Sequence, residues 1–110
     1  MPRPFSAWPL REERLLRVVL AGELDVATVG EFEAVLPHPA PGDLLAIDLR
    51  EVSFIDSAGV HALMRLDVSA RRDGWSLAVV RGPSGVQRVL DLCRVGERIQ
   101  CVDRPEQLLQ

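Results

Sequence analysis

The chain has 110 residues, 47% of them apolar and 26% charged, a composition that favours one ordered domain with a hydrophobic core over a disordered chain. Thirteen Lys and Arg residues stand against 16 Asp and Glu residues, and a net charge of −3 without any basic run argues against nucleic-acid binding. No apolar run approaches the roughly 18 residues that span a membrane, and the first residues lack a signal-peptide pattern, so we expect a cytoplasmic protein with no membrane partner.

The first quarter of the chain predicts a β-hairpin. Apolar residues recur between prolines in residues 1–11, which is typical of a short edge strand. The segment from Leu15 to Ala21 is rich in β-branched residues and predicts a stronger strand, which Gly22 would close. The charged residues 11–14 between the two segments predict the hairpin turn.

A helix is predicted next, with Asp25 as its N-cap. Val29, Phe32 and Leu36 follow at i, i+3 and i+7, and this spacing places them on one helical face. The proline-rich residues 37–42 cannot continue a helix, so they predict a stiff loop.

The central strand is predicted over residues 44–49, whose apolar side chains on both faces are typical of a strand covered on both sides. A helix follows Asp56 and ends at the cationic, glycine-terminated residues 71–74. One apolar stripe of this helix would pack on the sheet: Gly59, Ala62, Leu63, Leu66 and Ala70. A second row, consisting of Val60, Met64 and Val68, is either covered by another part of the fold or offered to a partner.

The last third predicts a strand over residues 75–80 and then a helix. Either Ser84 and Gln87 form a capping box for this helix, or Gly82 caps it with Pro83 at the first position. Its buried face would contain Val86, Val89, Leu90 and Cys93, and Gly96 would mark its end. A short strand over residues 99–102 and a helical turn over residues 105–110 complete the chain.

The predicted elements follow the order β-β-α-β-α-β-α-β-α. Strand–helix alternation implies right-handed crossovers, so the sheet should be mostly parallel, with four to five strands and helices packed on it. The N-terminal hairpin adds an antiparallel edge. Residues 1–110 are therefore predicted to form a single α/β domain.

Ser57 lies at a predicted strand–helix junction, where free N–H groups favour phosphate chemistry. No catalytic base, metal-ligand set, P-loop or dinucleotide motif accompanies it, so Ser57 is better interpreted as an acceptor of phosphate than as a nucleophilic catalyst. Cys93 and Cys101 lack zinc partners and are expected to be half-buried thiols. His38 and His61 are expected at the surface. We expect that the protein is not an enzyme and binds no cofactor. The alternative is a small enzyme or carrier that uses Cys93 or Cys101.

Two segments carry a resemblance to a known family, Gly22-Glu23-Leu24-Asp25 and the stretch DLREVSFIDSAG over residues 48–59. Together they resemble the STAS domain family and, within it, the small bacterial anti-sigma factor antagonists. The resemblance implies a STAS-type fold in which Ser57 is phosphorylated by an anti-sigma factor that is also an ATP-dependent serine kinase. In that family the unphosphorylated form binds the anti-sigma factor and frees a sigma factor, and a phosphatase resets it. Ala58 replaces a second Ser or Thr, and Val60-His61 replaces the commoner Leu-Gly, two departures that bear on kinase recognition.

The resemblance also implies a partner-binding surface around Ser57, in a monomer or weak dimer. Its expected members are Gly22, Glu23, Leu24, Asp25, Asp56, Ala58, Gly59, Val60, His61 and Met64. Simpler roles stay open: Ser57 as an N-cap, Asp56 as a turn former, Asp25 as a helix cap and Gly59 as a close-packing position. The alternative function is a STAS scaffold or sensor module that is never phosphorylated and binds a protein or a small ligand.

Phosphate on Ser57 would add about −1.5 to −2 charges at pH 7. The helix N-terminus would favour this charge by roughly 0.3–1 kcal/mol, whereas Asp56 and a neighbouring Asp25 would oppose it. We expect these effects nearly to cancel within the domain, so that the added charge acts mainly on the partner.

Overall fold

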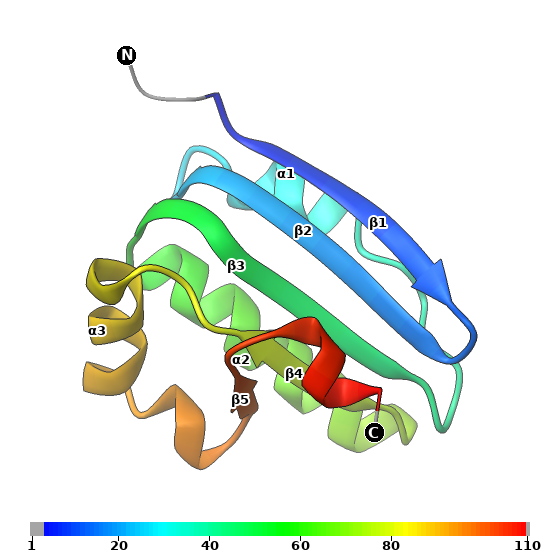
Figure 1. Cartoon of the computed structure of the whole chain (residues 1–110). Helices are drawn as coiled ribbons and strands as arrows, with labels where there is room; N and C mark the ends of the chain where they lie inside the picture. Colours follow the sequence, from blue (N-terminus) through cyan, green and yellow to red (C-terminus); the bar gives the residue numbers. More distant parts are fainter. Residues whose placement is uncertain (1–3, 110) are drawn as a thin grey trace.

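Five strands lie side by side in one mixed sheet, in the order β1-β2-β3-β4-β5 (Figure 1). The computed structural model describes residues 4–109. The strands are β1 (Ser6–Glu12), β2 (Leu15–Leu24), β3 (Leu44–Ile55), β4 (Ser76–Val80) and β5 (Gln100–Val102). β1 runs antiparallel to β2, and the remaining neighbours pair in parallel, which confirms the predicted α/β fold with its antiparallel edge. The first three residues of the predicted edge strand and Gln110 of the predicted last turn lie outside the described residues.

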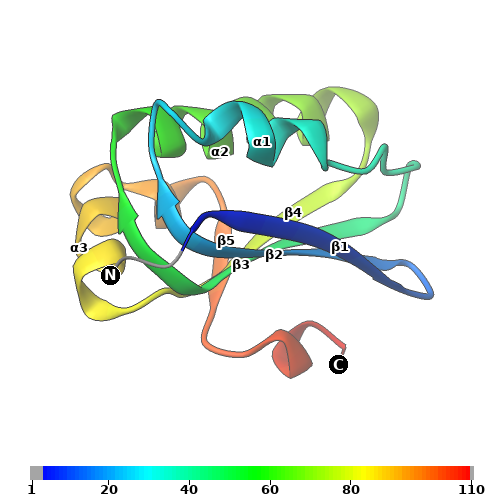
Figure 2. The ribbon, with the colours of Figure 1, turned by 90° about the horizontal axis from the view of Figure 1, so that it is seen from above.

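The helices also follow the predicted order. They are α1 (Val29–Ala34), α2 (Ser57–Asp73) and α3 (Ser84–Leu92), and two 3-10 turns complete the chain, η1 (Val95–Glu97) and η2 (Pro105–Leu108). Figure 2 shows α1 and α2 over one face of the sheet and η2 on the opposite side. The sheet therefore has two different faces, a helix-covered face and a second face with η2.

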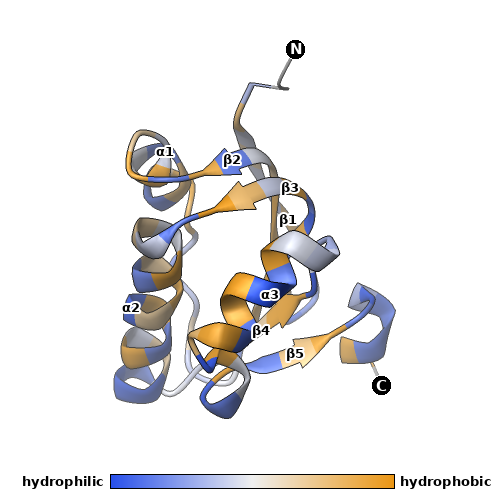
Figure 3. Cartoon of the chain, turned by 90° about the vertical axis from the view of Figure 1, so that its left-hand side faces the viewer, coloured by the Kyte–Doolittle hydropathy of each residue, from blue (hydrophilic) through white to orange (hydrophobic). Residues whose placement is uncertain are grey.

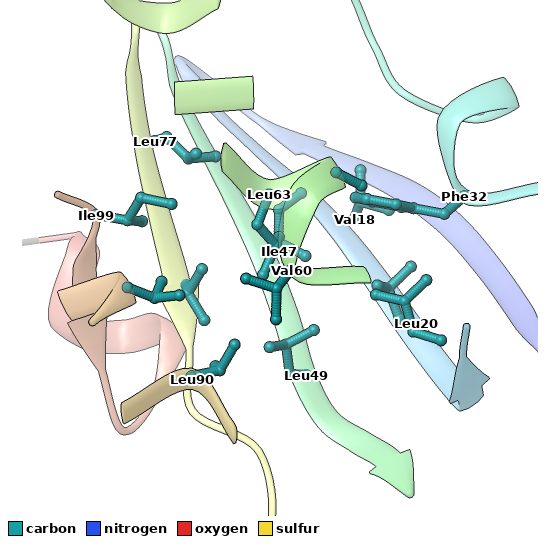
Figure 4. Packing of buried hydrophobic residues seen from close by; sticks show 14 of the residues in the cluster. Val18, Leu20, Phe32, Ile47, Leu49, Val60, Leu63, Leu77, Leu90 and Ile99 are labelled. Atoms are coloured by element: carbon teal, nitrogen blue, oxygen red, sulfur yellow. The ribbon is translucent and has the colours of Figure 1, made fainter. Parts of the chain in front are cut away.

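The main core lies between the sheet and the helices. Val18 of β2 and Ile47 of β3 point into it and are fully buried. Phe32 of α1 lies beside Val18, and Leu63 of α2 lies beside Ile47 (Figure 4). Along α2 hydrophobic and hydrophilic segments alternate (Figure 3), as expected of a helix that packs one side on a sheet.

The predicted apolar stripe of α2 is confirmed, because four of its five residues are buried and Leu66 is half-buried. The second row is divided. Val60 is buried in the core and Met64 packs partly against it, whereas 60% of Val68 is exposed. The fold therefore covers the start of this row and leaves its end open.

Both central strands are longer than the sequence predicts. β2 runs through Gly22 to Leu24 instead of closing at the glycine, and β3 runs to Ile55 instead of ending at residue 49. Gly22 has a φ of 93°, and the pairing with β3 shifts register directly after it, as at a β-bulge. The glycine bends the strand and does not end it. Residues 22–24, which the sequence prediction placed after the strand, therefore belong to β2.

Two predicted helix starts were wrong, by three residues for α1 and by one residue for α3. α1 begins at Val29 after Thr28, so Asp25 caps the preceding turn and not the helix. α3 begins at Ser84 after Pro83 with no side-chain cap, so neither the capping box nor the Gly82 cap forms. The predicted end of α2 is confirmed, since Gly74 adopts the left-handed conformation there with a φ of 78°.

The second face of the sheet carries a buried ion pair on β3. The Asp48 carboxylate is 2% exposed, and the Arg50 side chain donates to both of its oxygens, from Nε at 3.0 Å and from Nη2 at 2.8 Å. These hydrogen bonds to Asp48 raise the pKa of the Arg50 guanidinium. Arg17 of β2 lies farther away, with Nη1 3.8 Å from the same carboxylate. Arg50 is thus the principal partner of a charge that the fold buries.

Replacing Arg50 should lower the stability of the fold, because the buried Asp48 carboxylate would lose its principal partner. We expect Arg50→Met to lower the free energy of unfolding by about 2 kcal/mol, because the carboxylate loses its two-point partner while staying buried. Urea denaturation followed by circular dichroism measures this. The control is Arg88→Met, which removes an exposed arginine of α3 that has no hydrogen bond or ion pair within residues 4–109. Equal stability of the two variants would contradict this role of Arg50.

Candidate functional site

The carboxyl ends of β2 and β3 meet at the N-terminus of α2. Leu24 and Ile55, the last residues of the two strands, are register partners. Asp25 and Asp56 each follow directly, and the backbone N–H of Asp56 donates to the carbonyl oxygen of Leu24 at 3.3 Å. Parallel strand pairing therefore brings together the two sequence segments singled out above, although 22 residues separate them in the chain.

Asp56 is the N-cap of α2, the role that the sequence left open for Ser57. Its backbone is extended, and its Oδ1 accepts hydrogen bonds from the N–H of Ala58 at 2.9 Å and of Gly59 at 3.3 Å. Ser57 is the first residue of the helix and is exposed. Within the described part of the chain its hydroxyl makes no hydrogen bond. The serine oxygen is therefore accessible and uncommitted.

Asp25 organises the turn that leads from β2 into α1. Its Oδ1 accepts from the N–H of Ala27 at 2.9 Å and of Thr28 at 3.1 Å. The Thr28 hydroxyl donates to the carbonyl oxygen of Glu23 at 2.7 Å and accepts from the N–H of Asp25 at 3.0 Å. Thr28, which the sequence interpretation missed, thus fixes the turn, and the Asp25 carboxylate is engaged within it.

Gly59 allows α2 to start close to the ends of both strands. A Cβ built on it would lie 2.7 Å from Cγ1 of Ile55 and 3.0 Å from the carbonyl oxygen of Leu24. A side chain at this position would force Ile55, Leu24 or the backbone to shift. The glycine is therefore a close-packing position, one of the two roles left open for it.

The expected partner-binding residues divide by exposure. Gly22, Leu24, Gly59 and Val60 are buried and support the surface from beneath. Glu23 and His61 are exposed, and Asp25, Asp56, Ala58 and Met64 are half-buried. His38 is also exposed, as predicted. Only some of the residues in the two motifs are therefore accessible to another molecule.

Two exposed apolar residues beside these motifs were missed. Val26, directly after Asp25, is 77% exposed, and Phe54, the register partner of Glu23, is 48% exposed. In the sequence, Phe54 has the appearance of an ordinary strand residue, and nothing in its pattern indicates which face of β3 it takes. We call Val26, Phe54, Ser57 and His61, with Glu23, the Ser57 surface.

The cysteines do not form a second site. Cys93 is exposed, so it does not belong to the buried face of α3, and the prediction of two half-buried thiols holds for Cys101 alone. Burial raises the pKa of the Cys101 thiol, which disfavours its reactive thiolate. No group of three His, Cys, Asp or Glu side chains within residues 4–109 could hold a metal ion. No helix in the same range is long and apolar enough to cross a membrane.

The five-stranded sheet with its antiparallel β1–β2 edge, and the meeting of the two segments at the β3–α2 junction, define the class of the domain as α/β with a mixed sheet. Residues 11–104 match the family model described as Mlab, STAS domain, and the chain belongs to the STAS domain family. A curated relative, Osmosensory protein A of Mycobacterium tuberculosis, is 32% identical over 81 residues, which cover 73% of this chain and 51% of that protein. The chain therefore spans about half the length of this relative.

Solved structures show the same fold at lower identity. An anti-sigma factor antagonist from Mycobacterium paratuberculosis superimposes with a TM-score of 0.78 at 19% identity, covering 96% of this chain and 92% of the other. A putative anti-sigma factor antagonist from Thermotoga maritima gives 0.77 at 19% identity, with coverages of 96% and 91%. The antagonist SpoIIAA in its unphosphorylated form gives 0.66 at 17% identity, with coverages of 96% and 93%. These likenesses confirm the STAS-type fold.

The close approach at Gly59 can be tested by adding one methyl group. We expect Gly59→Ala to lower the free energy of unfolding by about 1–3 kcal/mol, because the overlap with Ile55 and Leu24 outweighs the gain in helix propensity. Chemical denaturation gives the value. Gly85→Ala in α3 is the matched control, since a Cβ there meets nothing within 4 Å and should stabilise the chain. A stabilised Gly59→Ala variant would show that the α2 start is not tightly packed.

Proposed function

We propose that the chain is an anti-sigma factor antagonist switched at Ser57. The unphosphorylated chain binds an anti-sigma factor with serine kinase activity, and the anti-sigma factor then releases its sigma factor. The kinase transfers the terminal phosphoryl group of ATP to the Ser57 hydroxyl, and binding ends. A phosphatase that acts on phospho-Ser57 returns the chain to its binding state. Such a chain is a binding protein and not an enzyme, and it works in the cytoplasm with its partners.

The observation that carries this proposal is the position of Ser57. Its hydroxyl is exposed at the first residue of α2, and no hydrogen bond within residues 4–109 occupies it. The Asp56 cap and the tight Gly59 packing hold the backbone on both sides of it. A kinase thus meets a rigid acceptor at a defined place, while within residues 4–109 no side chain accepts a hydrogen bond from the Ser57 hydroxyl as a catalytic base would.

The same geometry explains why phosphate would act on the partner more than on the fold. The N–H groups of Ala58 and Gly59 already donate to Asp56, so they are not free to bind a phosphoryl group. Asp56 adds a like charge next to Ser57. The dianion therefore gains little from its own domain and projects toward solvent. A partner that covers the site would have to desolvate it.

Val26 and Phe54 supply the apolar part of the proposed contact. Both are exposed, Phe54 one residue before the end of β3 and Val26 two residues after the end of β2, and large apolar side chains of this kind commonly anchor interfaces. Glu23 is also exposed there, and a basic group on the partner would complement it. The unphosphorylated surface therefore combines an apolar anchor with a single free hydroxyl.

A charge at Ser57 should abolish partner binding without unfolding the domain. We expect Ser57→Asp to weaken binding to the cognate anti-sigma factor by at least about tenfold, or about 1.4 kcal/mol, because a charge enters the contact. Its thermal unfolding midpoint should match that of the unchanged chain. Isothermal titration calorimetry and a thermal melt measure the two quantities.

The control for this variant is Ser84→Asp. Ser84 is also an exposed serine at the first residue of a helix, α3, and lies outside the Ser57 surface. It should leave binding unchanged. A large stability loss in Ser57→Asp, or equal effects of the two variants, would contradict the proposed switch.

Incubation with the kinase and ATP, followed by mass spectrometry, tests the acceptor directly. We expect one phosphate per chain, on Ser57. Absence of phosphate on Ser57 with every cognate kinase would favour the alternative function, a STAS scaffold or sensor module that is not phosphorylated.

A further inference from the structure

A groove on the second face of the sheet lies apart from the Ser57 surface. It runs between the β1–β2 hairpin and the C-terminal turn η2 and contains a solvent-open cavity of about 400 Å³. Figure 2 shows η2 on the side of the sheet opposite α1 and α2, and thus away from the helix that begins at Ser57. The volume is within the range of roughly 300–1,000 Å³ usual for small-molecule sites.

Apolar side chains form much of the wall of this groove. Leu10 of β1, Leu15 of β2, Pro105 of η2 and Leu109 line it. Leu10 is 44% exposed and Leu109 is 54% exposed, although both are large apolar residues. Exposed leucines that face one cavity from two distant parts of the chain indicate a surface suited to an apolar body.

Arg17 lines the groove with a guanidinium group whose N–H donors make no hydrogen bond within residues 4–109. Its side chain is 28% exposed and its Nη1 lies 3.8 Å from Asp48, too far for a hydrogen bond. Arg50 already donates to both oxygens of that carboxylate. Within residues 4–109 the Arg17 side chain makes no hydrogen bond. One buried carboxylate thus faces two guanidinium groups, and the donors of Arg17 remain available to a second anion.

Charged side chains at the rim of the groove limit how much negative charge an anion bound to Arg17 can carry. Arg11, Glu12 and Glu106 also line the cavity, and all three residues are exposed. With Arg17, the lining carries two positive and two negative side chains. A single carboxylate can pair with Arg17, whereas a di- or triphosphate would meet the two glutamates as well.

We propose that this groove binds a small amphipathic monocarboxylate. The carboxylate accepts from the Arg17 guanidinium, whose planar fork suits two-point recognition of such a group. The apolar body lies over Leu10, Leu15 and Leu109. Binding here uses the opposite face of the sheet from Ser57, so it does not depend on the proposed phosphorylation switch.

Octanoate and 1-octanol have the same chain length but differ in charge. Comparing their affinities therefore separates the contribution of the carboxylate from that of the apolar chain. Each is titrated into the full chain labelled with ¹⁵N, and amide shifts are followed by NMR. We expect saturable shifts centred on Leu10, Leu15, Arg17 and Leu109, with octanol binding about tenfold more weakly because it cannot form the charge-assisted pair. Arg17→Gln should weaken octanoate about tenfold and leave octanol unchanged. Asp48 keeps Arg50 in this variant, so the fold should persist.

Arg88→Gln on the exposed side of α3 is the control and should bind octanoate as the unchanged chain does. A second variant, Leu10→Ser, should weaken the binding of both probes, because it removes an apolar side chain from the groove and leaves the Arg17 guanidinium in place. Equal affinity for octanol and octanoate, unchanged octanoate binding in Arg17→Gln, or the absence of saturable shifts would overturn the proposal. So would groove shifts that appear with protein concentration alone, which would assign the groove to a second copy of this chain.

Discussion

The parallel pairing of β2 with β3 continues to the last residue of each strand, and the geometry of the candidate site depends on this. Leu24 pairs with Ile55, and the N–H of Asp56 donates to the carbonyl oxygen of Leu24. The start of α2 is thereby fixed against β2, at a distance where a Cβ at position 59 would lie 2.7 Å from Cγ1 of Ile55 and 3.0 Å from the carbonyl oxygen of Leu24. Asp56 then caps the helix, and Ser57 takes the first helical position at the surface. Each step constrains the next, so the serine is held by backbone contacts rather than by its own side chain.

The sequence predicted the element order and the antiparallel edge because apolar periodicity and the proline and glycine breaks are local signals. It failed where a local signal has two structural meanings. Gly22 can end a strand or bend it at a bulge, and its φ of 93° within β2 resolves this in favour of the bulge. Cys93 fits the helical spacing of a buried face, yet it lies past the last residue of α3 and is exposed. Phe54 gave no sign of its exposure, because the outward face of β3 is determined by tertiary packing.

The sequence predicted the location of the candidate site, but it was less successful in assigning the roles of the individual residues. The two motifs do meet, as the resemblance implied, but Asp56 and not Ser57 is the cap, and Asp25 serves the turn before α1. This division of roles strengthens the proposed switch. With Asp56 occupying the N–H groups of Ala58 and Gly59, a phosphoryl group on Ser57 has little to bind within its own domain. On the opposite face, Asp48 is satisfied by Arg50, which leaves Arg17 as the feature that this switch does not use.

The central claim is that phosphate on Ser57 changes the surface and leaves the fold intact. Comparison of ¹H–¹⁵N NMR spectra of the chain before and after stoichiometric phosphorylation tests this most directly. The account predicts shifts confined to the first turn of α2 and the carboxyl ends of β2 and β3, with the amides of the central sheet and of α3 unchanged. Shifts spread through β3, β4 and α3 would contradict it, because they would show that phosphate rearranges the domain itself.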